Sequence, residues 1–168
     1  MTSLPMRQTL IDILLTLLIL LLQTTLVRFL AVGGLEPDIV LVWIVFYALR
    51  RGQIPGTIAG FASGLLLDLL SGADGMLGLA ALSKTVAGFL TGYYFNENKT
   101  LQTLGSYRSV LILAGMAFVH NLIYFTIFLQ GTDVGVWGAV ALYGIPSAVY
   151  TAAIGLLPMF AYARRLLS

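Results

Sequence analysis

Long runs of apolar residues, separated by short polar turns, dominate the chain from residue 10 onward. An apolar run of about 20 residues is what an α-helix needs to cross the hydrocarbon core of a bilayer. Glycine, proline and charged residues mark the turns, because they favour helix ends over helix interiors. The pattern predicts an all-α polytopic membrane protein, with one integral membrane domain over residues 1–168 and six transmembrane helices at approximately 10–32, 37–51, 54–70, 76–95, 107–130 and 146–162.

The second predicted helix is short for a membrane span. It begins at Pro37, which suits a first helical turn because its missing N–H has no partner to lose there, and it ends at Arg51. About 15 residues at 1.5 Å each give only ~22 Å of helix. We therefore expect this helix to lie within a bundle.

The last apolar stretch is too long for one upright span. A single helix over residues 134–165 would measure ~48 Å, which exceeds the ~30 Å hydrocarbon core by half. Gly144 and Pro146 are expected to break it into a segment lying at the membrane interface, residues 134–143, and a sixth helix. The alternative is one steeply tilted helix.

Composition and charge placement agree with this scheme. At 59% hydrophobic and 10% charged residues, the chain has more apolar surface than a soluble domain of its size could bury. Acidic residues fall in the alternate turns, at Glu36, Asp38, Asp74 and Asp133. Basic residues gather on the opposite side, at Arg7, Arg50, Arg51, Lys99, Arg108, Arg164 and Arg165. The excess of positive charge in cytoplasmic loops places both termini in the cytoplasm.

Gly56, Gly60 and Gly64 recur at every fourth position of the third predicted helix. This spacing aligns them on one helix face, where the missing side chains let another helix approach closely. The neighbour is either another helix of this chain or the helix of a partner protein.

Ionisable residues within predicted spans are costly in lipid and are therefore candidates for function. The outer half of the bundle is expected to hold an intramembrane polar cluster, and near the cytoplasmic end Asp12 is expected to reach water or a basic loop residue. In one interpretation Arg28 pairs with Asp68 to pin two helices, while the other polar groups bond to their neighbours. In the other, the cluster lines a small-ligand pocket open to the outside. The members of the cluster are Arg28, Asp68, Lys84, His120 and Asn121.

The sequence offers no pattern typical of an enzyme. The chain has no cysteine and a single histidine, so it lacks the ligands of a zinc site and a credible Ser-His-Asp arrangement. It also lacks the glycine-rich loop that cradles phosphates, and its basic residues form no stripe suited to nucleic acid. We expect no catalysis, no cofactor, no metal and no nucleic-acid partner.

The stretch from Pro37 to Leu79 resembles the rod shape-determining MreD family. The resemblance rests on Pro37 and Asp38, on A-L-R-R-G at residues 48–52 with Arg50 and Arg51, on Gly60 and Gly64, on L-L-L-D-L-L-S-G at 65–72 with Asp68, and on L-G-L at 77–79. It implies a multi-pass subunit of the bacterial cytoplasmic (inner) membrane without enzymatic activity. Such a subunit maintains rod shape by binding MreC. It links MreB filaments, directly or indirectly, to peptidoglycan synthesis by RodA and its penicillin-binding transpeptidase.

A second family has a similar architecture. The substrate-capture subunits of energy-coupling-factor vitamin transporters are also small six-helix membrane proteins, and they use an outward polar pocket. They typically carry an alanine-rich small-x-x-x-small face on the first helix, whereas residues 10–22 here are nearly all leucine and isoleucine. This departure makes the transporter subunit the alternative interpretation.

Overall fold

The computed structural model describes residues 6–71, 76–133 and 135–167. Within them the fold is helical, apart from a single β-bridge between Val32 and Leu35. The elements are α1 (Met6–Thr25), η1 (Val27–Leu30), α2 (Ile39–Arg51), α3 (Gln53–Ser71), α4 (Leu79–Gly92), η2 (Glu97–Lys99), α5 (Thr100–Leu104), α6 (Tyr107–Phe128), α7 (Val136–Ala139), the π-helical η3 (Val140–Gly144), α8 (Ile145–Ile154) and α9 (Leu156–Leu167).

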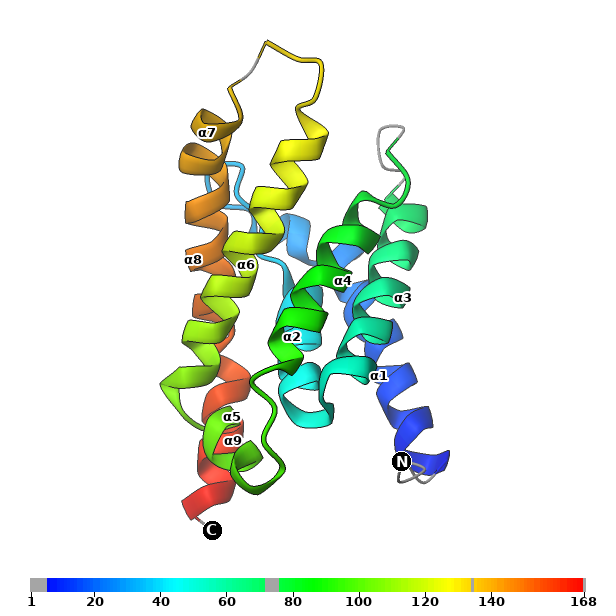
Figure 1. The fold of residues 1–168 in the computed structure, drawn as a ribbon, viewed down its shortest axis with the longest axis vertical. Coiled ribbons are helices and arrows are strands. Elements are labelled where there is room, and N and C mark those ends of the chain that lie inside the picture. The colour runs from blue at the N-terminus through cyan, green and yellow to red at the C-terminus, as the bar shows by residue number, and fades with distance from the viewer. Residues whose placement is uncertain (1–5, 72–75, 134, 168) are drawn as a thin grey trace.

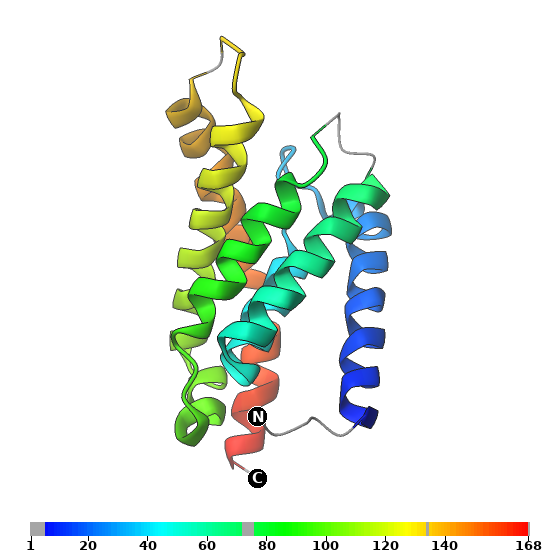
Figure 2. The ribbon, with the colours of Figure 1, turned by 45° about the vertical axis from the view of Figure 1, so that its right-hand side comes forward.

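The helices form an elongated bundle (Figure 1). On one side α6 packs along α8, and on the other α3 packs along α4. Turning the bundle by 45° shows α1 at the edge away from α6 and α8 (Figure 2). Among the described residues, the start of α1 and the last residues of α5 and α9 lie at one end of the bundle. The turn that follows α6 lies at the opposite end.

Four helical stretches of the described chain are long and apolar enough to cross a membrane: Met6–Thr25, Gln53–Leu70, Tyr107–Phe128 and Val136–Leu166. Large apolar side chains on their outer faces, such as Leu14, Leu111 and Leu157, are exposed. Apolar surface of this extent faces lipid rather than water. The protein is therefore a multi-pass membrane protein with an all-helical fold.

The short helix α2 lies at the centre of the bundle. It contacts α1, α3, α4, α6 and α8, and eight of its 13 residues are buried. A helix with neighbours on most sides needs apolar residues over most of its surface, which explains its run of valine, isoleucine, leucine and phenylalanine. The expectation that this helix lies within a bundle is confirmed. Pro37 does not open the helix, however, because Asp38 is the N-cap residue and Pro37 precedes it.

The predicted boundaries of two helices are wrong by several residues. The first helix occupies residues 6–25 instead of 10–32, because the chain turns into η1 and then into two glycines with positive φ, Gly33 and Gly34. The fourth spans residues 79–92 instead of 76–95, because it starts after Gly78 in the left-handed conformation and ends in tight turns at Tyr93. Hydropathy extends through such turns, so apolar length alone overstated both helices. The acidic turn with Asp74 lies outside the described residues.

The predicted break at Gly144 and Pro146 is also wrong. Helical backbone runs from Val136 to Ile154, so residues 136–143 do not form a separate segment, and residue 134 lies outside the described chain. At η3 the N–H of Ile145 donates to the carbonyl of Val140, five residues earlier. This wider turn accommodates Pro146, which has no N–H and whose ring would crowd the carbonyl four residues before it in an α-helix. A turn at Gly155 then separates α8 from α9.

Candidate functional site

The three glycines of α3 pack against α4 of the same chain. A Cβ atom added to Gly64 would lie 2.6 Å from the backbone of Ala80 and Ala81, and one added to Gly60 would lie 2.8 Å from the carbonyl carbon of Lys84. At Gly56 it would lie 2.9 Å from the carbonyl oxygen of Gly88. Real Cβ atoms do not approach so closely, so only glycine fits along this seam. Backbone therefore meets backbone along the α3–α4 contact.

The Lys84 side chain leaves this seam on another side of α4. Lys84 is 1% exposed, and its Nζ forms an ion pair with Oδ2 of Asp38 at the start of α2. His120 of α6 completes the group: its Nε2 lies 3.4 Å from the Lys84 Nζ and 3.8 Å from Asp38 Oδ2. A buried charge is tolerated only where a partner compensates it, and Asp38 is that partner. These three residues, called the core ion cluster below, join α2, α4 and α6.

The core ion cluster continues into η3. His120 Nδ1 lies 3.2 Å from Oδ1 of Asn121, and Asn121 Nδ2 donates a hydrogen bond of 2.7 Å to the carbonyl of Gly144. A neutral His120 with its proton on Nδ1 satisfies both of its hydrogen bonds, because it donates to Asn121 and accepts from the Lys84 ammonium. Each polar group therefore has a partner, and the chain of contacts fixes the π-helical turn against α6.

Asp38 has a second role in the same place. Its Oδ1 accepts a 2.8 Å hydrogen bond from the N–H of Leu41, which caps α2, and its own N–H donates to Oγ1 of Thr151 on α8. A carboxylate that caps a helix also interacts favourably with the positive end of the helix dipole. One residue thus fixes the start of α2 against α4 and α8 together.

Asp68 forms a separate site at the end of the α3–α4 hairpin. Its carboxylate accepts hydrogen bonds of 3.0 to 3.1 Å from the N–H groups of Gly78, Ala80 and Ala81. These are donors at the start of α4 that have no partner within the helix. The structure therefore does not bring Asp68 into one cluster with Lys84 and His120, contrary to the sequence interpretation. The predicted partner, the Arg28 side chain, lies outside the described side chains.

The arginines that close α2 meet α1. Arg51 Nη2 lies 3.1 Å from Asp12 Oδ2, and Arg50 Nη2 lies 3.6 Å from Asp12 Oδ1. Arg50 also donates a 3.4 Å hydrogen bond to the hydroxyl of Tyr162 on α9. Asp12 therefore reaches basic residues, but these close helix α2 and do not belong to a loop as expected.

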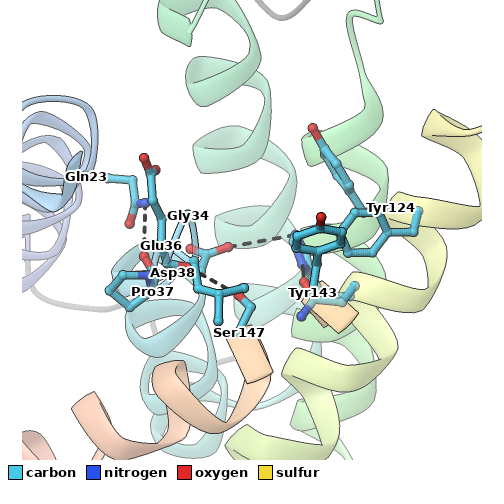
Figure 3. Close-up of a pocket in the computed structure, with 12 residues that line it drawn as sticks. Gln23, Gly34, Glu36, Pro37, Asp38, Tyr124, Tyr143 and Ser147 are labelled. Atoms are coloured by element: carbon cyan, nitrogen blue, oxygen red, sulfur yellow. Dashed lines mark hydrogen bonds and ion pairs between the residues drawn. The ribbon is translucent and has the colours of Figure 1, made fainter. Parts of the chain in front are cut away.

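A cavity of about 460 Å³ opens beside the core ion cluster (Figure 3). Gln23, Glu36 and Pro37 line one side, and Tyr124 and Tyr143 line the other, with Asp38 between them. His120 and Asn121 also reach the wall. Aromatic walls with a few convergent polar groups are typical of small-molecule sites. Among the described residues no group of three or more His, Cys, Asp or Glu side chains could hold a metal ion.

Sequence reasoning missed Asp38 as the partner of Lys84, because it placed Asp38 in an outer turn and Lys84 deep in a span. One signal could have identified the pair. Proline followed by aspartate before an apolar run is typical of an N-cap, and a capping carboxylate points into the bundle where its helix is buried. Comparison with known proteins adds no further residue: no protein-family model, no curated protein and no solved structure matches this chain.

Proposed function

We propose that this chain is a non-enzymatic subunit of the bacterial cell-elongation complex, similar to the MreD family, in the cytoplasmic (inner) membrane. In this role it binds MreC and connects MreB filaments with the peptidoglycan synthase RodA and its transpeptidase. The subunit maintains rod shape as a scaffold. Its own residues carry out no chemical step.

One observation supports the proposal: each charged residue on which the resemblance rests either caps a helix or pairs with a residue of another helix. Asp38 caps α2 and pairs with Lys84, Asp68 caps α4, and Arg50 and Arg51 meet Asp12 of α1. The glycines of the same motif form the α3–α4 seam. A scaffold subunit requires residues that hold its helices together. An enzyme would instead leave some of its charged groups facing a substrate.

The orientation belongs to the same proposal. Six spans with both termini in the cytoplasm put α5 on the cytoplasmic side and the turn after α6 outside. Helices α2 and α4, with 13 and 14 residues, are short for spans, and their packing inside the bundle supports counting them among the six.

Cysteine labelling tests this orientation. The chain has no cysteine, so Thr132→Cys and Asn98→Cys each introduce a single thiol at an exposed position. The assay uses cells whose wall and any outer membrane have been removed but whose cytoplasmic membrane is intact. In these intact cells an impermeant thiol reagent is expected to label the cysteine at 132 and not the one at 98. Permeabilised cells are the control and should label both. Labelling of the cysteine at 98 in intact cells would contradict the six-span scheme.

Copurification tests the function. A tagged copy expressed at native level in its own host and solubilised in a mild detergent is expected to retain MreC, identified by mass spectrometry. A tagged, unrelated multi-pass membrane protein from the same cells is the matched control and should not retain it. Recovery of a coupling ATPase in place of MreC would overturn the proposal.

A second candidate function is capture of a small molecule for an energy-coupling-factor transporter. The observation that favours it is the 460 Å³ cavity between α6 and the turn that precedes α2, which the proposed orientation opens to the outside. The two functions are distinguished by the partner found in the copurification. They share one fold class, and a shared architecture does not decide between them.

A further inference from the structure

The inner end of the bundle holds an excess of positive charge at one point. The guanidinium groups of Arg50 and Arg51 both face the single carboxylate of Asp12. One carboxylate neutralises one guanidinium, so the group carries a net positive charge. The looser contact is that of Arg50: at 3.6 Å it exceeds the 2.7 to 2.9 Å of a charge-assisted hydrogen bond, and its side chain is 35% exposed.

A cavity of about 390 Å³ opens beside these arginines. Its walls are Gln8, Ile11 and Asp12 of α1 together with Arg50 and Arg51 of α2. Arg51 holds Asp12 and Gln8 through Nη2, while its buried Nε has no hydrogen-bond partner among the described residues. A buried donor without an acceptor is costly. An anion in this cavity would supply hydrogen-bond acceptors and negative charge to the two guanidinium groups.

An apolar groove of about 400 Å³ adjoins the charged cavity. Asp12 lines both, and from there the groove runs between α1 and α3 over Ile13, Leu17, Trp43, Ile58 and Ala62. The cavity and the groove thus place a cationic end and a long apolar wall side by side. Inorganic phosphate would use only the cationic end.

We propose that this composite site binds an anionic phospholipid of the inner leaflet. The phosphate lies against Arg50 and Arg51, whose planar guanidinium groups match phosphate oxygens in pairs. One acyl chain lies in the groove between α1 and α3. Basic pockets between helices on the cytoplasmic side are suited to lipid headgroups, and the proposed orientation puts this end of the bundle there. The neighbouring Asp12 carboxylate repels the phosphate, but the second arginine offsets it.

Native mass spectrometry of the purified full chain tests the site. The protein is exchanged from detergent into equimolar phosphatidylglycerol and phosphatidylcholine with matched acyl chains, and the retained lipids are counted. We expect phosphatidylglycerol to be retained in preference. Arg50→Gln leaves the 3.1 Å contact between Arg51 and Asp12 in place and should weaken that preference about fivefold, or about 1 kcal/mol, because the direct contact between the Arg50 guanidinium and the phosphate is lost.

Two further variants separate the parts of the site. Ala62→Phe adds a ring at an exposed groove position without changing any charge, and it should reduce retention of both diacyl lipids. The double change Lys99→Gln and Arg108→Gln removes two exposed charges at the α5 and α6 end and should leave the preference unchanged. This pair is the matched control for a general effect of net charge.

The outcomes decide the proposal. Equal retention of the two lipids overturns it, and so does an unchanged preference in Arg50→Gln. If that variant does not fold, normal lipid retention in Ala62→Phe overturns it independently. Displacement of phosphatidylglycerol by millimolar inorganic phosphate, with no effect of Ala62→Phe, would assign the arginines to a free phosphate and reject the lipid.

Discussion

Replacing Lys84 by methionine is expected to lower the free energy of unfolding by about 3 to 5 kcal/mol, the cost of removing one partner of a buried ion pair. Methionine matches the length of the lysine stem, so the change removes the charge while keeping most of the packing. It leaves the Asp38 carboxylate facing His120 without a cation inside the bundle. The measurement is an unfolding titration of the purified protein in mixed micelles with a denaturing detergent.

A paired substitution identifies the cause. Adding Asp38→Asn to Lys84→Met removes the stranded carboxylate, and asparagine retains the ability to cap α2, so part of the loss should be recovered. Lys99→Met, at an exposed position of η2, is the matched control and should change the unfolding free energy little. If Lys84→Met unfolds like the wild type, the core ion cluster does not hold α2, α4 and α6 together.

Replacing Gly60 by leucine is expected to remove about 3 kcal/mol or more of stability, at the upper end of what overpacking costs. Even the first carbon of the new side chain would lie 2.8 Å from the carbonyl carbon of Lys84. The contact is with backbone, which cannot rotate away as a side chain can. The two helices must separate, and Lys84 moves with α4, so the ion pair with Asp38 should weaken as well.

Gly115→Leu in α6 is the matched control for this substitution. Gly115 is also a helical glycine, but a Cβ atom added there would meet no atom within 4 Å beyond the backbone of its own helical turns, so leucine at this position enters open space. Thermal aggregation of the two variants in the same detergent compares them directly. A melting temperature of Gly60→Leu equal to that of Gly115→Leu would contradict the close seam between α3 and α4.

The class of the protein and the bounds of two of its long helices followed from the sequence alone. Apolar length and the residues at turns are local properties, so residues 54–70 and 107–130 were predicted within two residues of α3 and α6. The glycine face of α3 could also be predicted, because helical periodicity alone aligns Gly56, Gly60 and Gly64. Which helix that face meets was left open, since periodicity says nothing about a neighbour.

The partners of the polar residues depend on how the helices pack. Asp38 and Lys84 are 46 positions apart, and their pairing depends on how α2 and α4 pack, which no local pattern reports. Asp68 accepts hydrogen bonds from backbone N–H groups. Nearly every residue has such a group, so the identity of the residues does not reveal these bonds. The π-helical turn at η3 likewise results from packing: Asn121 holds the carbonyl of Gly144 from α6, so a helix that Pro146 was expected to break continues. A pattern along the chain reports which surfaces are apolar, whereas each of these bonds depends on groups that only the folded bundle brings within 4 Å.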